Sequence, residues 1–530
     1  MTAKAKASVG KERLFMELQL KKEPVFLNEV IYDGQTEQGV EFDYVLPDYY
    51  PDIFKILKCS LTPGISSYSI SGTQLFVDGA VLIKILYLSD DNVNIHCVEQ
   101  KYTYSKTLEL TKAADNPTVY IQTKTDYSNC RAISGRRFDV RGAVSCKIKA
   151  TASKTMEIIS GAEELETKSE MLTYCGNKLI GGGQFVIRED IETGTGKGGI
   201  LGIVHCDATA EINDIKIIAG KAVVKGESKV KALYLVKIDE ETQDTEVMEA
   251  SIPISRIIDL DGLDDSYTCY ADVKVMDCGL EIKPGDNGDN RILGCDLTID
   301  CKITANKENS VPVLTDLFST KYETEYTKSN VKVEYAPQQI QKQLSYKTVI
   351  DCKDGNLEEI FDCRCDINSI NCRFNGEGNL IITGQLISQA IGRLSDSGYP
   401  VFIEKSEPAE LSCEVGFTDE NCIIEPGIQV TDVGFNINGD STVELRITLV
   451  LNGCIYKMKN VAIIENVILD DEKPKEKNTD YGLKMYYAEE NEEIFTVAKK
   501  YNTKPEAIME ENELDEEVLS APCLLLIPIV

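Results

Sequence analysis

A long internal repeat constrains the fold of this chain more than any other feature. The run ILKC at residues 56–59 returns as IVHC at 203–206, and ILYL at 85–88 returns as ALYL at 232–235. In both cases, and for Gly79 and Gly226 between them, the copies lie 147 residues apart. Because this register holds over about thirty residues, the sequence predicts an array of repeated modules.

The length of the chain agrees with this period. At 530 residues, the usual size of about 150 residues per domain predicts three or four domains. A third copy follows Cys365, where Gly384 opens the run GQLISQAI, 158 residues after Gly226. The larger spacing indicates that insertions separate the second and third copies.

The repeated runs alternate apolar and polar residues with a period of two. After Gly79, residues Val81, Ile83 and Ile85 share one face and Lys84 points to the other. Short alternating runs separated by Gly and Pro predict a mainly β chain of tandem β-sandwich-like modules. Sequence alone barely separates a sandwich from a barrel.

Charge and composition exclude several classes of function. The net charge of −31 disfavours binding to nucleic acids and to anionic membrane surfaces, and the absence of Trp disfavours a stacking surface. No apolar run approaches the ~20 residues of a membrane helix, and the N-terminus does not resemble a signal peptide. We therefore expect a cytosolic protein without membrane insertion, whose eighteen cysteines are mostly buried, free thiols.

The pattern divides the chain into five parts. A mixed segment at 313–323 predicts a connector with a short helix, and the polar run from Asp470 predicts a solvated tether. The expected parts are module one at 15–156, module two at 157–312, a weaker module three at 330–469, a linker at 470–482 and a terminal domain at 483–530.

The terminal part has the pattern of a strand, two helices and a strand. Residues 483–487 alternate, Ile494, Val497 and Ala498 have helical spacing, and Pro505 suits the first turn of a second helix. This βααβ pattern resembles a LysM domain, in the run IFTVAKKYNT at 494–503 and in LLIP at 525–528. LysM domains bind N-acetylglucosamine polymers in a groove between two loops. By position, the resemblance assigns the groove to Asn491, Glu492, Glu493, Ile494, Phe495, Asn512, Glu513 and Leu514.

Two features separate this domain from the glycan-binding pattern. The usual Gly-Asp-Thr before the first helix is replaced by residues 491–493, Asn-Glu-Glu, and the late Gly by Pro522. Residues 481–530 also carry 11 acidic and 4 basic side chains. This surface offers few donors to a sugar, so we weigh a protein ligand against a glycan ligand.

The modules carry a resemblance as well. The run LPDYYPDIFKIL at 46–57, with VDG at 77–79 and KILYL at 84–88, is similar to the SPOCS module of spore-coat-associated proteins. Several such modules before a LysM domain is the layout of SipL-like proteins. The resemblance implies a non-enzymatic sporulation scaffold, made in the mother cell and lying at the forespore surface in the spore coat. It also implies that the LysM domain binds the coat-basement ATPase, stage IV sporulation protein A.

Other readings stay open at this point. Other coat proteins, a second copy of this chain and peptidoglycan are alternative partners, and a peptidoglycan-binding cell-wall or cortex protein is the alternative function. The sequence leaves open the oligomeric state, the module that contacts each partner, and whether any cysteines pair or bind a metal.

An enzyme would need a cluster that the sequence does not display. The only histidines are His96 and His205, each beside a cysteine, and no motif supplies further partners for a His-based triad. The best metal candidates, Cys352, Cys363, Cys365 and Cys372, lack the paired short spacings of a zinc site. We therefore expect no enzymatic activity, cofactor or metal.

Two further motifs have ordinary explanations. In the Gly-rich run 194–199, Lys197 is followed by Gly198 where a phosphate-binding P-loop needs Ser or Thr, which favours a loop. Asp48 and Asp52 each directly follow a proline, and two prolines restrict the backbone here. We assign this pair to capping a helix after Pro51.

Overall fold

The computed structural model describes most of the chain as β-strands. The described residues are 19–89, 95–114, 117–176, 178–194, 198–237, 243–285, 288–417, 421–475 and 482–529. They form twenty-two strands and two short helices, so the chain is mainly β as predicted. No helix among them is long and apolar enough to cross a membrane.

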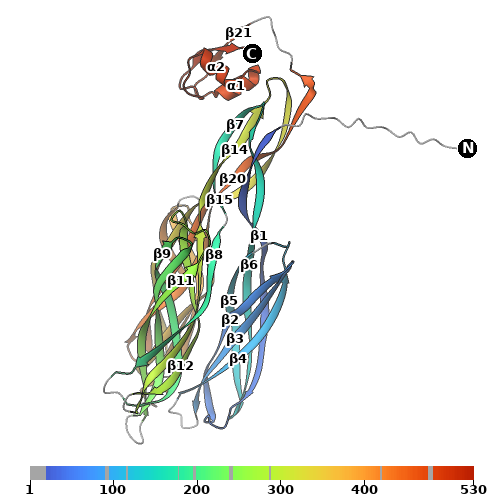
Figure 1. Ribbon diagram of the computed structural model, residues 1–530. Coiled ribbons are helices and arrows are strands. Elements are labelled where there is room, and N and C mark those ends of the chain that lie inside the picture. The colour runs from blue at the N-terminus through green and yellow to red at the C-terminus, as the bar shows by residue number, and fades with distance from the viewer. Residues whose placement is uncertain are drawn as a thin grey trace, which may run out of the picture.

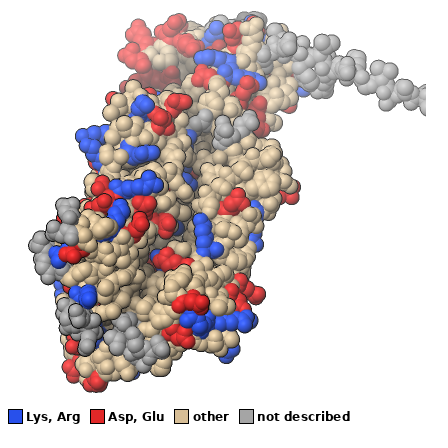
Figure 2. All heavy atoms as spheres, turned by 60° about the horizontal axis from the view of Figure 1, so that its bottom comes forward, with Lys and Arg blue, Asp and Glu red and all other residues tan. Residues whose placement is uncertain are grey.

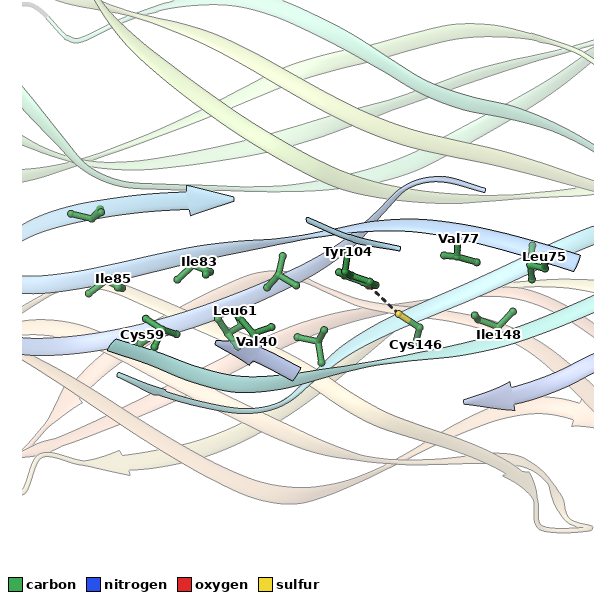
Figure 3. Close-up of a cluster of buried hydrophobic side chains, with 14 of the residues drawn as sticks. Val40, Cys59, Leu61, Leu75, Val77, Ile83, Ile85, Tyr104, Cys146 and Ile148 are labelled. Carbon is green, nitrogen blue, oxygen red and sulfur yellow. Dashed lines mark hydrogen bonds between the residues drawn. The ribbon is translucent and has the colours of Figure 1, made fainter. Parts of the chain in front are cut away.

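The first module consists of two three-stranded antiparallel sheets packed face to face. One sheet has the order β1-β6-β5 and the other β2-β3-β4. The strands are β1 (Leu20–Val45), β2 (Ile53–Ser71), β3 (Gln74–Ser89), β4 (Ile95–Glu109), β5 (Thr118–Ser134) and β6 (Arg137–Ala162). Figure 3 shows side chains of both sheets filling the space between them, with a hydrogen bond of 3.2 Å joining Tyr104 Oη to Cys146 Sγ.

The repeated glycine has a steric reason. A Cβ atom on Gly79 would lie 2.2 Å from the ring of Tyr104, which crosses the strand at this point. On Gly226 it would lie 2.0 Å from the carbonyl oxygen of Glu211. Neither approach is possible for a residue with a side chain, so both copies require glycine where a neighbour comes this close.

The second and third units repeat this topology. Their sheets have the orders β8-β13-β12 and β9-β10-β11, then β15-β20-β19 and β16-β17-β18. The second unit comprises β7 (Glu166–Cys175), β8 (Leu179–Glu192), β9 (Ile200–Ile218), β10 (Lys221–Lys237), β11 (Gln243–Asp259), β12 (Thr268–Pro284), β13 (Asn290–Asn306) and β14 (Glu308–Phe318). The third comprises β15 (Tyr322–Asp351), β16 (Leu357–Phe374), β17 (Gly378–Leu394), β18 (Pro400–Phe417), β19 (Cys422–Asn438) and β20 (Thr442–Pro474). The pairing β7–β14 continues the pairing β8–β13 beyond a break in both strands.

The three modules pack side by side as a closed ring. Strand β4 contacts β9, β11 contacts β16, and β18 contacts β2. An apolar cluster at this junction takes Leu86 and Leu88 from module one, Leu233 from module two, and Phe361 and Ile391 from module three. The modules therefore share buried apolar surface, rather than following one another as beads on a string.

The long strands of all three modules extend beyond the sandwiches into a common stalk. We define the stalk as residues 20–30, 151–162, 166–175, 308–318, 322–335 and 457–474, seen in the upper half of Figure 1 around β7, β14, β15 and β20. Val25, Leu172, Val311, Val333 and Ile463, one from each of five strands, are buried in one cluster there. A single ribbon of two strands is only marginally stable. The three ribbons of the stalk pack together and bury a shared apolar core.

The prediction of a short helix in the connector at residues 313–323 is wrong. Residues 308–318 form strand β14, which pairs with β7. A bulge between Leu314 and Asp316 breaks the period of two and buries both Leu314 and Leu317. Two apolar residues three positions apart imitate helical spacing, which explains the error.

The expected linker begins later than predicted. Strand β20 runs to Pro474 and pairs with β15, with Asp470 opposite Glu323 and Pro474 opposite Tyr322. Backbone pairing in an exposed ribbon needs no apolar side chains, so the polar composition of this segment misled the prediction. Residues 476–481 of the linker, and residues 15–18 at the start of module one, lie outside the described residues.

The terminal domain has the order strand, helix, helix, strand. Strands β21 (Leu483–Ala488) and β22 (Cys523–Pro528) pair antiparallel, and α1 (Ile494–Tyr501) and α2 (Pro505–Glu511) lie between them in sequence. Helix α1 ends at Asn502, whose left-handed backbone lets its N–H bond to the carbonyl of Ala498. Pro505 occupies the first turn of α2, as its fixed φ favours.

Candidate functional site

The two loops predicted to form a groove lie side by side in the terminal domain. The N–H of Asn491 donates to the carbonyl of Leu519 at 2.8 Å, and the N–H of Ile494 donates to that of Glu517 at 2.8 Å. Residues 489–494 are therefore tied to the segment that leads from α2 to β22. These bonds reach Glu517 and Leu519, and the predicted residues 512–514 precede them in the same segment.

Several of the predicted groove side chains are already engaged within the chain. Ile494 is fully buried in the core of the domain. The side-chain amide of Asn512 donates to the carbonyl of Leu526 at 2.6 Å, and its oxygen accepts from the Leu526 N–H at 2.7 Å. Glu492 accepts a hydrogen bond of 2.7 Å from the hydroxyl of Tyr486. These three residues hold the domain together.

The remaining predicted residues differ in their exposure. Asn491 and Glu513 are exposed and both have positive φ, at 65° and 52°. Leu514 is half-buried against the core. Glu493 and Phe495 face the stalk, and the contact that they make was not expected from the sequence.

The terminal domain is docked on the tip of the stalk. The rings of Phe495 and Phe318 meet edge to face with centroids 5.2 Å apart, and Phe318 is buried in the core cluster of the terminal domain. Lys168 Nζ lies 2.7 Å from a carboxylate oxygen of Glu493, and Lys499 Nζ lies 2.5 Å from Asp316 Oδ1. The picture of a domain held only by a solvated tether is therefore corrected.

The electrostatics at this contact favour the charged pairs. Burial pushes the pKa of Asp316 upward, but the hydrogen bonds from Lys499 and Tyr326 outweigh it and hold that pKa below its usual range. The amide of Asn502 adds a hydrogen bond of 2.9 Å to the carbonyl of Thr320. Nothing in the sequence pattern marks Lys168 or Phe318 as partners of residues more than 170 positions away.

A second candidate site lies where the three modules meet. A cavity of about 1340 Å³ is lined by strands β2, β5, β9, β12, β16 and β19, which are edge strands of their sheets. Figure 2 looks toward this end of the molecule and shows the hollow between the modules with charged side chains along it. The cavity therefore joins residues from all three copies.

Charges of both signs meet in this cavity. Lys58 of module one pairs with Glu404 of module three, and Arg364 of module three pairs with Asp207 of module two. The strand pairing aligns Cys59, Cys206 and Cys363, because each lies opposite the residue six positions after the repeated glycine of its copy. The equivalent positions directly before these cysteines therefore hold Lys58, His205 and Asp362.

Comparison with known proteins gives one match. Residues 52–133 and residues 199–283 match the family model described as SipL, SPOCS domain. These two segments are similar to SPOCS domains. The comparison with curated proteins gave no match, and the comparison with solved structures gave none either.

The matched SPOCS segments coincide with parts of the fold that face the cavity. The first covers β2 to β5 and the second covers β9 to β12. The long first and last strands of each module, which build the stalk, lie almost entirely outside the matched residues. The match supports a SipL-like, sporulation-related protein, and β16 to β19 repeat the same strand order outside the matched segments.

The acidic pair at the start of the first SPOCS segment has a structural partner. The guanidinium of Arg136 donates to Asp52 at 2.7 Å, lies 3.7 Å from Asp48, and donates to the carbonyl of Pro47 at 2.6 Å. The predicted helix after Pro51 is wrong, because Ile53 begins strand β2. The guanidinium of Arg136 therefore fixes the turn before β2, and the carboxylates of Asp48 and Asp52 are its charged partners there.

The two histidines lie in the matched segments, on strands β4 and β9. His96 lies against the ring of Tyr87 at 5.5 Å. His205 is buried, and its Nδ1 has no hydrogen-bond partner among the described residues. Burial, together with the charges of Arg364 and Lys84, holds the pKa of His205 well below its usual range. This side chain is therefore neutral at physiological pH.

The cysteines considered as metal ligands are spread over the third module. Cys363 and Cys365 are buried on β16, Cys372 lies near the other end of that strand, and Cys352 precedes it. Within the described residues no group of three or more His, Cys, Asp or Glu side chains is placed to hold a metal. All eighteen cysteines are free thiols in the structure, and only Cys97, Cys130, Cys372 and Cys523 are half-buried rather than buried.

The Gly-rich run at 181–183 forms part of a strand, with positive φ at Gly182 and Gly183. Gly181, Gly182 and Gly183 lie in β8 and pair with β13. The second motif includes residues 195–197, which lie outside the described residues.

Proposed function

We propose that this chain is a non-enzymatic sporulation scaffold that recruits the coat-basement ATPase, stage IV sporulation protein A, to the forespore surface through its LysM-like terminal domain. The observation that carries the proposal is the way in which the terminal domain is attached to the three modules. All three modules contribute strands to one stalk, and the terminal domain sits on its tip through the Phe318–Phe495 contact. A scaffold of this kind holds a binding domain at a fixed distance from the modules.

The side chains of the terminal domain support a protein ligand over a glycan. Ile494 and Phe495 are buried, Glu493 pairs with Lys168, and the amide of Asn512 is bonded to the backbone of β22. A sugar-binding groove needs free hydrogen-bond donors and flat apolar platforms. The predicted groove residues that remain exposed, Asn491 and Glu513, provide little of either.

The acidic pair and the histidine that were weighed as candidate catalytic groups make structural contacts instead, which supports the proposal of a scaffold. Asp48 and Asp52 surround Arg136, and His205 is buried and neutral. Some charged residues of the cavity are paired between modules, as Arg364 is with Asp207 and Lys231 with Asp362. These contacts determine how the modules fit together, and none of them presents a nucleophile beside a base.

Two pulldown experiments test the proposal. The full chain and a chain ending at residue 481 are each mixed with purified coat-basement ATPase and, separately, with insoluble peptidoglycan. We expect the full chain to retain the ATPase, the shortened chain to lose it, and neither to sediment with peptidoglycan. Retention on peptidoglycan without retention of the ATPase would favour the cell-wall function instead, and retention of the ATPase by the shortened chain would assign binding to the modules.

A further inference from the structure

The terminal domain has an apolar sheet face that no described element covers. Strands β21 and β22 pair so that Leu483 lies opposite Pro528, Met485 opposite Leu526, and Tyr487 opposite Leu524. Because alternate residues of a strand share a face, these six side chains lie together on one side. We call them the outer sheet face: Leu483, Met485, Tyr487, Leu524, Leu526 and Pro528.

The opposite side of the same sheet supplies the core of the domain. Ala488, Leu525 and Ile527 are fully buried against α1 and α2. By contrast, Met485 is 73% exposed, Tyr487 67% and Leu524 56%. A sheet with one buried side ordinarily carries polar residues on the other. The apolar outer side is not needed for folding, and contiguous exposed apolar patches of this kind mark interaction sites.

The surroundings of the outer sheet face are strongly acidic. Glu489 and Glu490 follow β21 directly at the Tyr487 end, and both are exposed. The exposed acidic residues of the domain are Glu489, Glu490, Glu506, Glu510, Glu511, Glu513, Asp515, Glu516 and Glu517, and none of them has an ion-pair partner among the described residues. Figure 2 shows this gathering of acidic side chains at the far end of the molecule.

The lysines of the domain do not balance these charges. Lys499 pairs with Asp316 of the stalk, Lys484 lies over the ring of Tyr501, and Lys500 over that of Tyr486. These three are held on the inner side of the sheet or at the stalk contact, and Lys504, the N-cap of α2, is exposed. An apolar centre remains, with an acidic rim made by Glu489 and Glu490 at its Tyr487 end.

We propose that the outer sheet face is the surface with which the terminal domain binds its protein partner, and that the partner presents an apolar strip flanked by Lys and Arg side chains. This inference rests on the proposed function and adds the surface to it. Tyr and Met are enriched in the centres of protein interfaces, and an opposite charge on the rim of the partner raises the association rate. Two residues of the predicted groove, Glu493 and Phe495, dock the domain on the stalk, so the proposal assigns binding to the outer sheet face instead.

Charge disfavours the other occupants of this face. A second copy of the chain would bring two acidic rims together, and like charges across an interface oppose association. An anionic membrane surface would be repelled for the same reason. A basic and apolar polypeptide meets both requirements of the face.

The test uses the full chain with the double substitution Met485→Glu and Tyr487→Glu. Its probe is the purified coat-basement ATPase of the proposed function, with binding measured by a titration at two salt concentrations. The matched control is Met171→Glu, because Met171 is also an exposed strand methionine, 63% exposed on β7 of the stalk. We expect affinity to fall about tenfold or more in the double variant and to change less than about twofold in the control. Thermal unfolding verifies that both variants are folded.

A second variant tests the rim. Exchanging both Glu489 and Glu490 for Lys should slow association and reduce its salt dependence, while the dissociation rate changes little. Unchanged affinity in the double variant at Met485 and Tyr487 overturns the inference. If the chain ending at residue 481 still binds, the proposed function itself fails. A dimer of the parent chain that Met485→Glu dissolves would assign the face to a second copy and would also overturn the inference.

Discussion

The two places where separate parts of this chain meet are built from different interactions. Between the modules, charged side chains form hydrogen bonds in a partly buried contact. Glu425 of module three accepts hydrogen bonds from Lys178 at 2.7 Å and from Tyr270 at 3.0 Å, both of module two. At the tip of the stalk, the centre of the contact is apolar, Phe318 on Phe495, and the ion pairs beside it are half-exposed.

This difference indicates separate roles for the two contacts. A buried ion pair adds little net stability but penalises any arrangement that leaves one charge unpaired, so we infer that it selects which modules meet and in what register. When an apolar contact with solvated charges at its edge opens, no buried charge is left without a partner, so this cost is absent. The module ring should therefore open only with global unfolding, and the terminal domain should detach at lower cost.

The largest effect is expected at the tip. Phe318→Ala removes a ring that is 2% exposed, and such a change costs about 3–5 kcal/mol when the cavity does not collapse. Because that ring belongs to the core cluster of the terminal domain, hydrogen exchange should rise across residues 482–529 and not in the modules. Phe54→Ala, at a phenylalanine 59% exposed on β2, is the control and should change exchange little. Equal protection in both variants would mean that other contacts hold the domain.

The next largest effect is expected between modules two and three. Glu425→Ala leaves Lys178 and Tyr270 without their shared acceptor, and we expect a loss of about 2–3 kcal/mol in the free energy of unfolding. This is below the range for a fully buried pair, because the side chain of Glu425 is 32% exposed. Denaturant titration measures the loss, and Glu410→Ala, which removes an exposed pair with Arg373, should cost under about 1 kcal/mol. Equal losses would contradict the distinction between the two kinds of pair.

Acid should affect the two regions in opposite directions. The pKa of Asp316 at the tip is depressed, so its stabilising contribution is present above the unfolded-state pKa of about 4 and is lost as the pH falls below it. In the cavity, desolvation by the surrounding modules and then the charge of Asp207 raise the pKa of Asp366, whose side chain is exposed to the open cavity, so protonation of that group on acidification favours the native state. Hydrogen exchange, corrected for its intrinsic pH dependence, should therefore rise first in the terminal domain. Asp366→Asn should remove the opposing effect in the modules.

The smallest effect is expected from the pair Lys168 and Glu493. Both side chains are about one-third exposed, and pairs of this kind contribute about 0.2–1 kcal/mol. A double-mutant cycle with Lys168→Ala and Glu493→Ala measures their coupling, which should shrink as salt is added. A coupling above about 2 kcal/mol would show that the contact is drier than its exposure indicates.

Local pattern predicted much of this fold because strands and helices differ in their apolar period. The alternation around Ile83 and Ile85 predicted the β modules, the spacing of Ile494, Val497 and Ala498 predicted α1, and the repeated glycines marked sites of close approach. The same reasoning failed at β14, where a bulge imitates a helix, and after Asp470, where backbone pairing is independent of side-chain polarity.

The candidate site could be predicted only in part. The order of the elements predicted that Asn491 follows the first strand and Asn512 the second helix, yet it does not predict which of these side chains are accessible. Whether Glu493 and Phe495 are free depends on Lys168 and Phe318, more than 170 residues earlier in the chain. The outer sheet face also emerged only from the pairing of β21 with β22, because alternation alone does not say which side of a strand is covered.

Local patterns were enough to predict a repeated, acidic, mainly β chain with a small mixed domain from residue 483 onward, because apolar period and turn residues act over a few neighbouring positions. The closing of the modules into a ring around a charged cavity, the joining of their long strands in one stalk, and the docking of the terminal domain on its tip depend on the folded arrangement of the whole chain. These contacts join residues that lie more than one hundred positions apart, such as Lys58 and Glu404. Their energy comes from surfaces that match in shape and charge once folded, and no local pattern in the chain records that match.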